Sequence, residues 1–313
     1  MQKITSKHAA FGEAEQARSS FTPAELAIVR RAYAGQMLAV AGVVNAVVEA
    51  AYVAVPRELF LGEPPWTIAS PFGGLRSLPR PDPALVYQDV LFALDPSRGV
   101  NNGSPSLHAR LLDALAPGQG ERITHIGAGS GYYTAILAEL VGPSGHIFAV
   151  EFDPILAARA AAVLADRSNV TVVRGDGAEW PQEAVYGVYV NFAVARPADR
   201  WIECLAPGGR LVFPLGAIGE KRPFGVHSDR GIALCVRRRP EGYAANALGP
   251  VSFVYADGPL GSVDAGEDAR LRRSFAAASP KEVRSLIWKQ SADEKNCWHV
   301  GEGWALSYEE IAD

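Results

Sequence analysis

The sequence predicts an α/β fold in which a mostly parallel sheet carries helices on both faces. The strand-like run Ile-Thr-His-Ile at 123–126 leads directly into three glycines, Gly127, Gly129 and Gly131, and a helical pattern follows at once. Further strand-like apolar runs then alternate with helical patterns along the chain. Strands that alternate with helices are typical of βαβ units, which build parallel sheets.

The N-terminal part is predicted to be helical after a flexible start at residues 1–21, which are polar. Thr22-Pro23 is typical of a helix start, since threonine caps the first turn and proline suits its first position. The long apolar run at 37–55 contains Glu49. A bilayer span needs about 20 predominantly apolar residues, and an acid within it is costly. We therefore expect a buried amphipathic helix there and no membrane contact.

Residues 61–86 hold six prolines and a Gly73-Gly74 pair, which predicts an insertion without regular structure. We expect a surface loop. Alternatively it forms a lid that selects the substrate, because long loops in compact domains are often functional. An edge strand is expected at 87–94, and a helix from Ser106 to Ala116.

The glycine-rich turn predicts a nucleoside-cofactor site. Glycines let a ligand approach the backbone, and the helix start offers free N–H groups. The strand at 146–151 ends in Glu151, which is suited to binding ribose hydroxyls. Asp176 follows the strand at 169–173 and can accept a hydrogen bond from an adenine amine. The G-x-G-x-G spacing departs from the G-x-G-x-x-G of dinucleotide sites, which favours S-adenosylmethionine over a nicotinamide cofactor.

The remaining chain predicts more strands and a helical end. A strand at 186–191 is followed by a Pro-Gly-Gly turn and another strand ending near Pro214. A loop is expected at 219–222, and then two strands that form a hairpin. Beyond residue 262 we expect two helices, at 267–278 and 279–289, and a short strand at 303–308. The tryptophans of this region are more typical of a core than of a ligand site.

This order of motifs, from the glycine turn through Glu151 and Asp176 to the run PGGRLVFP, resembles the class I S-adenosylmethionine-dependent methyltransferases. Among them it is most similar to the protein-L-isoaspartate O-methyltransferase family. The resemblance covers residues 25–260 and includes Tyr87-x-Asp89 and the PSLHA run at 105–109. It implies a Rossmann-like seven-stranded methyltransferase sheet at 22–262, which contains the insertion at 61–86, and a helical C-terminal extension at 263–313.

The resemblance also implies the site residues. In the family a Thr-Ile-Ser sequence carries a serine at the reaction centre. Aligning Pro105 and His108 puts Asn101-Asn102-Gly103 there, so that Gly103 replaces the serine. We expect Asn101 and Asn102 to be catalytic by orienting the acceptor. The expected cofactor-binding residues are Gly103, His108, His125, Gly127, Ala128, Gly129, Gly131, Glu151, Phe152, Asp176, Gly177 and Asn191. His125 stands where many methyltransferases have an acid, and a purely structural role for it is an equal alternative.

A carboxylate acceptor is ionised at neutral pH and needs no general base. No Ser-His-Asp or paired-carboxylate pattern is evident, although His108 remains a candidate base. We therefore expect O-methylation of a carboxylate on a peptide or protein other than ordinary isoaspartate. A small-molecule or nucleic-acid methyltransferase and a catalytically silent S-adenosylmethionine-binding protein stay open as alternatives.

Composition narrows the partners. The chain is 48% hydrophobic and 20% charged, which is ordinary for a soluble globular protein with a large core. A net charge of −4 argues against a broad nucleic-acid-binding surface. The cysteines Cys204, Cys235 and Cys297 lack metal-ligand spacing, so we expect reduced thiols and no metal. The N-terminus carries no apolar signal region, which favours a cytoplasmic protein.

Overall fold

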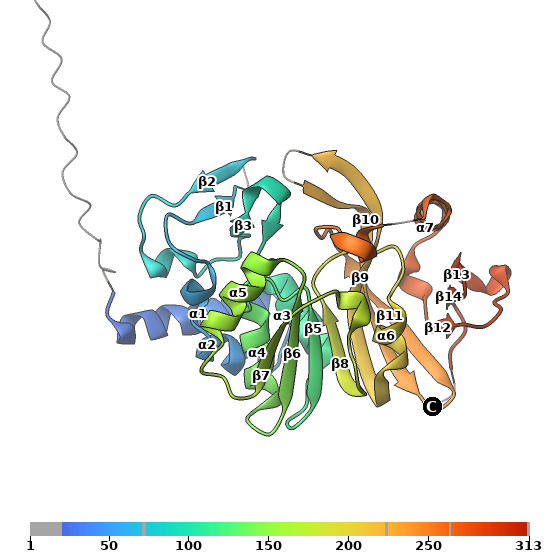
Figure 1. Cartoon of the computed structure of the whole chain (residues 1–313), viewed down its shortest axis with the longest axis horizontal. Coiled ribbons are helices and arrows are strands. Elements are labelled where there is room, and N and C mark those ends of the chain that lie inside the picture. Colours follow the sequence, from blue (N-terminus) through green and yellow to red (C-terminus); the bar gives the residue numbers. More distant parts are fainter. Residues whose placement is uncertain (1–20, 71–72, 223–224, 263, 312–313) are drawn as a thin grey trace, which may run out of the picture.

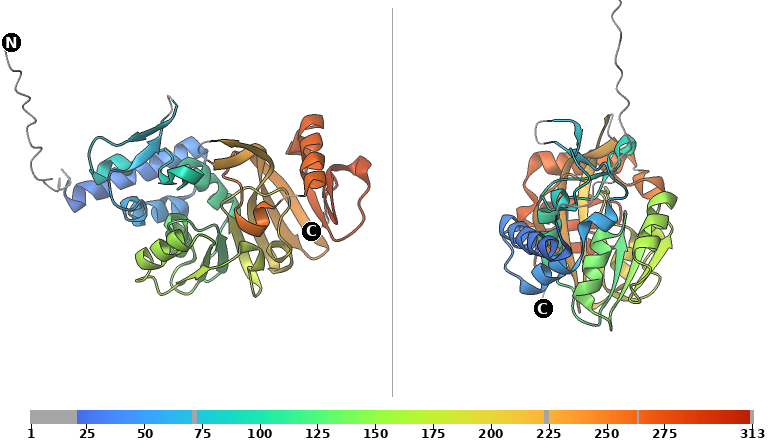
Figure 2. Two further views of the ribbon diagram at one scale, coloured as in Figure 1. Left: turned by 45° about the horizontal axis from the view of Figure 1, so that its top comes forward. Right: turned by 90° about the vertical axis from the view of Figure 1, so that its left-hand side faces the viewer.

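The computed structural model describes residues 21–70, 73–222, 225–262 and 264–311. The expected flexible segment 1–21 lies outside these residues, apart from Phe21. A sheet of ten strands runs through the molecule in the order β13-β14-β12-β11-β10-β9-β8-β5-β6-β7 (Figure 1). The helices at 23–54 and the C-terminal extension lie at opposite ends of the molecule (Figure 2).

The parallel half of the sheet confirms the predicted alternation of strands and helices. Its strands are β5 (Arg122–Ile126), β6 (His146–Glu151), β7 (Val170–Arg174) and β8 (Val185–Val190). Their helices are α4 (Tyr132–Val141), α5 (Pro154–Val163) and α6 (Asp199–Glu203). All of the pairings among these strands are parallel, so their carboxyl ends lie at one edge.

Helices cover both faces of the sheet, and side-chain alternation along the strands explains why. In β9 (Leu205–Arg222), Val212 belongs to one buried apolar cluster, whereas its neighbours Leu211 and Phe213 belong to a second. Successive residues of a strand point to opposite faces. The first cluster contains the N-terminal helices and α4, and the second contains residues of α6 and α7 (Ala265–Ala277).

The antiparallel half consists of β9, β10 (Gly225–Arg239) and β11 (Gly242–Pro250), which complete the seven expected strands. The loop expected at 219–222 is wrong, because β9 continues to Arg222 and pairs with β10 up to Gly225. Contacts from α7 support this long hairpin. Asp268 accepts a hydrogen bond from the Ile218 N–H at 2.8 Å, and Arg272 donates to the Ile218 carbonyl.

The C-terminal extension corrects the expectation of a helical unit. The first helix is present as α7, but the second is reduced to a single turn at Pro280–Glu282. The chain then forms β12 (Ser285–Trp288), β13 (Cys297–Gly301) and β14 (Trp304–Ser307), so the sheet has ten strands and not seven. The physical reason is the edge of β11, which pairs with Ser285 and Leu286. The tryptophans of this region are buried, as expected of a core.

The N-terminal helices are α1 (Pro23–Ala41), α2 (Ala46–Ala54) and α3 (Pro105–Leu115). Thr22 caps α1 in a reciprocal pair with Glu25, which confirms the predicted start. The expected single apolar helix at 37–55 is divided in two, because Gly42 ends α1 at a φ of +68° and Asn45 caps α2. Within the described residues, none of the helices is both long and apolar enough to cross a bilayer.

The segment between α2 and α3 departs most from expectation. The insertion at 61–86 contains a short hairpin, β1 (Thr67–Ala69) with β2 (Leu75–Ser77), so it is not free of regular structure. The edge strand expected at 87–94 is absent except for β3 (Ala93–Asp95), which pairs with β4 (Val100–Asn101). The buried Arg57 explains this difference, since it donates hydrogen bonds to the carbonyls of residues 86, 88 and 90 that a neighbouring strand would otherwise use.

Candidate cofactor and active site

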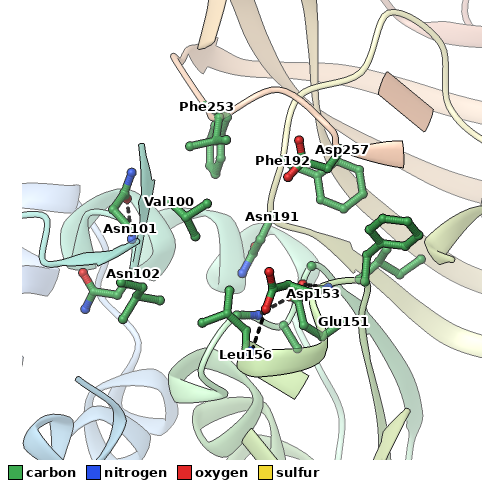
Figure 3. Close-up of a pocket in the computed structure, with 18 of the residues that line it drawn as sticks. Val100, Asn101, Asn102, Glu151, Asp153, Leu156, Asn191, Phe192, Phe253 and Asp257 are labelled. Atoms are coloured by element: carbon green, nitrogen blue, oxygen red, sulfur yellow. Dashed lines mark hydrogen bonds between the residues drawn. The ribbon is translucent and has the colours of Figure 1, made fainter. Parts of the chain in front are cut away.

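A cavity of about 290 Å³ lies at the carboxyl ends of the parallel strands (Figure 3). Its walls come from the glycine turn after β5, the ends of β6 and β8, the loop at 98–104 and the segment at 252–257. Ligands of open α/β sheets bind at this edge, where loops from several strands converge. The cavity is therefore the candidate functional site.

The glycine turn forms one wall of the cavity. Gly127 has a φ of +75°, and a Cβ there would lie 2.6 Å from the Phe192 ring. Gly131 has a φ of +95°, and a Cβ there would lie 2.8 Å from Leu164. Any other residue would be strained at both positions. No side chain caps the start of α4 at Gly131, so the first N–H groups of this helix are available to a ligand.

Glu151 faces the turn from the end of β6. Its Oε2 accepts the Gly129 N–H at 2.7 Å, and its Oε1 accepts the Asp153 N–H at 2.9 Å. Burial raises the pKa of Glu151, and the two backbone donors oppose that shift. Each oxygen keeps a second lone pair for a ligand hydroxyl.

Asp176, which is expected to bind the adenine, also lines the cavity. Asp176 accepts the Ala178 N–H at 2.9 Å, which shapes the turn after β7. A Cβ at Gly177 would lie 2.3 Å from Ile126, so only glycine fits beside β5. Ala128 and the half-exposed Phe152 complete this part of the wall.

The two predicted histidines differ in their relation to the cavity. His125 is fully buried and does not line it, so the structure does not bring His125 into direct contact with a ligand there. Its Nδ1 bonds to Thr134 at 2.8 Å, and its Nε2 lies 2.7 Å from Nδ2 of Asn191, which does line the cavity. Burial lowers the pKa of His125 to about 3, so the ring is neutral and accepts the amide hydrogen. His125 therefore orients Asn191.

His108 does line the cavity. It stacks on Tyr133 with ring centroids 3.7 Å apart, and its Nδ1 lies 2.6 Å from the Tyr189 hydroxyl. Burial, followed by the neighbouring His125 and Arg57, lowers the pKa of His108 well below its usual value. The ring is therefore neutral at physiological pH, with its Nε2 directed toward Gly103.

The loop expected to be catalytic lies opposite the glycine turn. Asn101 folds back on this loop, because its Oδ1 accepts the Gly103 N–H at 2.9 Å and its amide donates to the Gly99 carbonyl. Asn102 accepts the Phe92 N–H at 2.8 Å, while its buried Nδ2 has no hydrogen-bond partner in the described part of the chain. Both asparagines line the cavity (Figure 3).

Three groups of wall residues were not singled out from the sequence. Arg98 forms ion pairs with Asp153 at 2.5 Å and with Asp257 at 3.5 Å, which joins three separate segments at the cavity. Phe253 and its neighbours form the opposite wall, together with His227. The position of Asp153, two residues after Glu151, could have identified it as a wall residue from the sequence. His227 and Phe253 reach the cavity because the β10–β11 hairpin brings them there, and Arg98 reaches it from the turn before β4.

The insertion lies beside the cavity. None of its described residues lines the cavity, but Ala69 of β1 donates its N–H to the carbonyl of Leu91, which does. The lid function stays a prediction. In the described part of the chain, no group of three His, Cys, Asp or Glu side chains is placed to hold a metal ion.

Comparisons with known proteins identify the family of the chain. The family model of the protein-L-isoaspartate(D-aspartate) O-methyltransferases matches residues 78–237. A protein-L-isoaspartate O-methyltransferase of Ignicoccus hospitalis is 32% identical over 65% of this chain and 85% of its own length. A second relative with this name, from an Anaeromyxobacter species, is 34% identical over 72% of this chain and 82% of its own.

Solved structures share the fold. A protein-L-isoaspartate O-methyltransferase superposes with a TM-score of 0.60 at 23% identity, covering 83% of this chain and 72% of the other. A Plasmodium falciparum structure in complex with S-adenosyl-L-homocysteine gives 0.55 at 15% identity, covering 72% and 97%. The sequence matches then decide the family: this chain belongs to the protein-L-isoaspartate(D-aspartate) O-methyltransferase family of S-adenosylmethionine-dependent methyltransferases.

Proposed function

We propose that this chain transfers a methyl group from S-adenosylmethionine to a carboxylate oxygen on a peptide or protein. One observation carries the proposal: a single cavity brings the glycine turn and Glu151 opposite a loop of uncharged residues at 101–104, in which the amide nitrogen of Asn102 has no partner in the described part of the chain. Family membership supports the methyl transfer, and the chemistry of that loop supports the carboxylate acceptor.

The residues present fit S-adenosylmethionine. Glu151 would bind the ribose hydroxyls, and Asp176 would bind the adenine amine. The backbone of the glycine turn would lie against the cofactor. Asn191 supplies an independent sign of a ligand, because its buried Oδ1 has no partner in the described part of the chain although His125 holds its amide nitrogen. A buried polar atom without a partner is costly unless a ligand or water satisfies it. An ammonium group of the cofactor is a donor suited to that oxygen.

The cofactor supplies a methyl carbon bound to a positively charged sulfur. With the cofactor bound, transfer to a carboxylate would form one C–O bond and break one C–S bond, with both electrons leaving on sulfur, so that no proton would have to move. The protein has only to align the reacting atoms about 3–3.5 Å apart and to orient the carboxylate. For this purpose Asn102 offers its unpaired Nδ2, and Asn101 holds the Gly103 backbone in place.

The neutral His108 suits this chemistry better as an orienting group than as a base. Its Nδ1 faces the Tyr189 hydroxyl, and its Nε2 faces the loop at Gly103. We propose that Gly103 replaces the family's reaction-centre serine because His108 occupies that space. A Cβ at residue 103 would lie 2.2 Å from the imidazole Nε2. The changed wall supports an acceptor other than an ordinary isoaspartyl peptide.

The test is methyl transfer from radiolabelled S-adenosylmethionine to a panel of peptides that carry aspartyl, isoaspartyl, glutamyl or C-terminal carboxylates. The expected product is a methyl ester, which releases methanol in mild base, with weak or absent turnover of the isoaspartyl peptide. A base-stable product, or transfer only to nucleic acid or small molecules, would overturn the proposal. Robust turnover of the isoaspartyl peptide would refute the role given to Gly103.

Variants of the loop refine this test. Asn102→Asp keeps the oxygen that accepts from Phe92, but it loses the amide donor and adds a charge that repels a carboxylate. We expect its kcat to fall about 100-fold or more, as for the loss of one oriented donor, with unchanged binding of S-adenosylhomocysteine. Equal kcat for the variant and the parent chain would remove Asn102 from the catalytic site.

A further inference from the structure

A second recess of about 300 Å³ lies on the sheet face that α3 covers, at the far end of that helix from the active-site cavity. Cys235 of β10 bonds to the Ala114 carbonyl near the end of α3, which places the recess where the helix stops covering the sheet. The residues that line it are Ala114, Cys235, Arg237, Arg239, Ala244, Ala245, Asn246 and Leu248. Its floor is made largely of small side chains, which leave room above the strands.

Two arginine side chains at this recess have no hydrogen-bond or ion-pair partner among the described residues. Arg237 is half-buried in the recess, and Arg110 is exposed on α3. Neither side chain forms a hydrogen bond or ion pair with another residue in the described ranges. Arg210 on the neighbouring strand, by contrast, is paired with Glu121 at 2.8 Å. Two uncompensated cations on one face attract an anionic group, even on a protein with a net charge of −4.

The backbone of β11 makes room for Arg110. Gly249 has a φ of +132°, and a Cβ there would lie 3.3 Å from Nη1 of Arg110. The guanidinium therefore lies against the strand at a point where a side chain would crowd it. Because Leu248 precedes this glycine and lines the recess, Arg110 lies at the recess border.

Two elements, α3 and β11, run from the recess to the active-site cavity, and the surface along them is called the groove below. On α3, Leu107 lines the cavity, Arg110 follows one turn later, and Ala114 lines the recess. Beside α3, β11 runs from the recess toward Ser252 and Phe253 in the cavity wall. The helix rises about 10 Å from Leu107 to Ala114, a distance that an extended chain covers in about three residues.

We infer that this groove binds the acceptor polypeptide through an acidic side chain, which Arg110 and Arg237 hold about three to five residues from the methylated residue. The inference rests on the proposed function, since it takes the acceptor to be a polypeptide. A nucleic acid is the less suitable occupant, because phosphate-backbone binding needs many cations along a strand and this groove offers two without partners.

The test measures binding and not turnover. Three fluorescein-labelled peptides of about eleven residues carry a central aspartate in a Gly-Ser-Ala background: one has glutamates about three to five residues before it, one has them after it, and one has glutamines at all of these positions. Fluorescence anisotropy with the full chain and saturating S-adenosylhomocysteine should show one glutamate peptide binding about three- to tenfold more tightly than the glutamine peptide. The preference should shrink as NaCl is added.

Variants assign the preference to the groove. Arg110→Gln and Arg237→Gln should bring the ratio of the two dissociation constants close to one without changing the binding of the glutamine peptide. Arg273→Gln is the matched control, because Arg273 is an exposed arginine on α7 in the C-terminal extension. It should keep the full preference.

Three results would overturn the inference: equal binding of all the peptides, no measurable binding of any, or a preference that survives both groove variants. An oligothymidylate that bound more tightly than the glutamate peptide, and lost this binding in Arg110→Gln, would assign the groove to nucleic acid and overturn it too. Failure of the proposed function is a separate result. In that case no methyl ester forms on any carboxylate, while the arginine-dependent preference for glutamate persists.

Discussion

Replacing Gly103 with serine tests how tightly the active-site loop is built around His108. At a φ of +75°, a residue with a side chain costs about 1–2 kcal/mol of strain. The new Cβ would also lie 2.2 Å from Nε2 and 2.6 Å from Cδ2 of a buried, stacked imidazole. Overpacking of this kind costs about 1–3 kcal/mol. We therefore expect Gly103→Ser to lower the free energy of unfolding by about 2–5 kcal/mol.

Gly208→Ser separates the two contributions. Gly208 has nearly the same φ, +76°, but a Cβ there meets nothing within 4 Å. The free energy of unfolding of Gly208→Ser should fall by the strain alone, about 1–2 kcal/mol. Urea unfolding followed by tryptophan fluorescence measures both variants. In a double-mutant cycle, His108→Ala should restore about 1–3 kcal/mol to Gly103→Ser. Equal stability losses for Gly103→Ser and Gly208→Ser would show that His108 does not crowd this position.

Contacts of Glu151, His125 and Arg57 give three further predictions. Glu151→Ala should weaken S-adenosylhomocysteine binding by about 1–3 kcal/mol through lost charged hydrogen bonds, as measured by isothermal titration calorimetry; an unchanged affinity would displace Glu151 from the ribose site. His125 has a folded-state pKa of about 3, so its neutral form stabilises the fold fully above pH 6.5. That stability should fall by up to about 1.4 kcal/mol per pH unit as the pH drops from 6.5 toward 3; urea unfolding at pH 7.5 and 5.0 should show a smaller difference for His125→Asn, and an equal difference would contradict this. Arg57→Met leaves the buried Val86 carbonyl and two part-buried carbonyls without their donor and should lower the free energy of unfolding by about 3 kcal/mol, whereas the exposed Arg273→Met should lower it by less than 0.5 kcal/mol, as is usual for surface positions; similar losses would refute the role of Arg57.

Local sequence determined the elements whose stabilising contacts lie within one or two turns of the chain. Thr22 and Glu25 cap the first helix within four residues, and the prediction of its start needed nothing else. The strand, glycine turn and helix at 122–141 were predictable for a similar reason, because only glycine suits the backbone angles of the turn. The acids at the ends of β6 and β7 line the cavity because parallel strands end at one edge.

Tertiary structure decided the elements whose partners are distant in sequence. The apolar run at 87–94 has the composition of a strand, but Arg57, about thirty residues earlier, takes the carbonyls that a strand would use. Residues 285–288 follow a plausible helix start, yet the edge of β11 pairs them into the sheet. Local propensity contributes only tenths of a kcal/mol per residue, so the larger free energy of burial and of pairing at a sheet edge outweighs it.

The site divides in the same way. Most of the residues predicted to hold the cofactor line the cavity, because they follow each other at strand ends. The sequence could not show that Asn191 faces the cavity while His125 lies behind it. Arg98 and Phe253 reach the cavity because chain folding brings segments more than one hundred residues apart into contact. The groove at Arg110 and Arg237 arises for the same physical reason, since a helix and a distant hairpin share one face of the sheet.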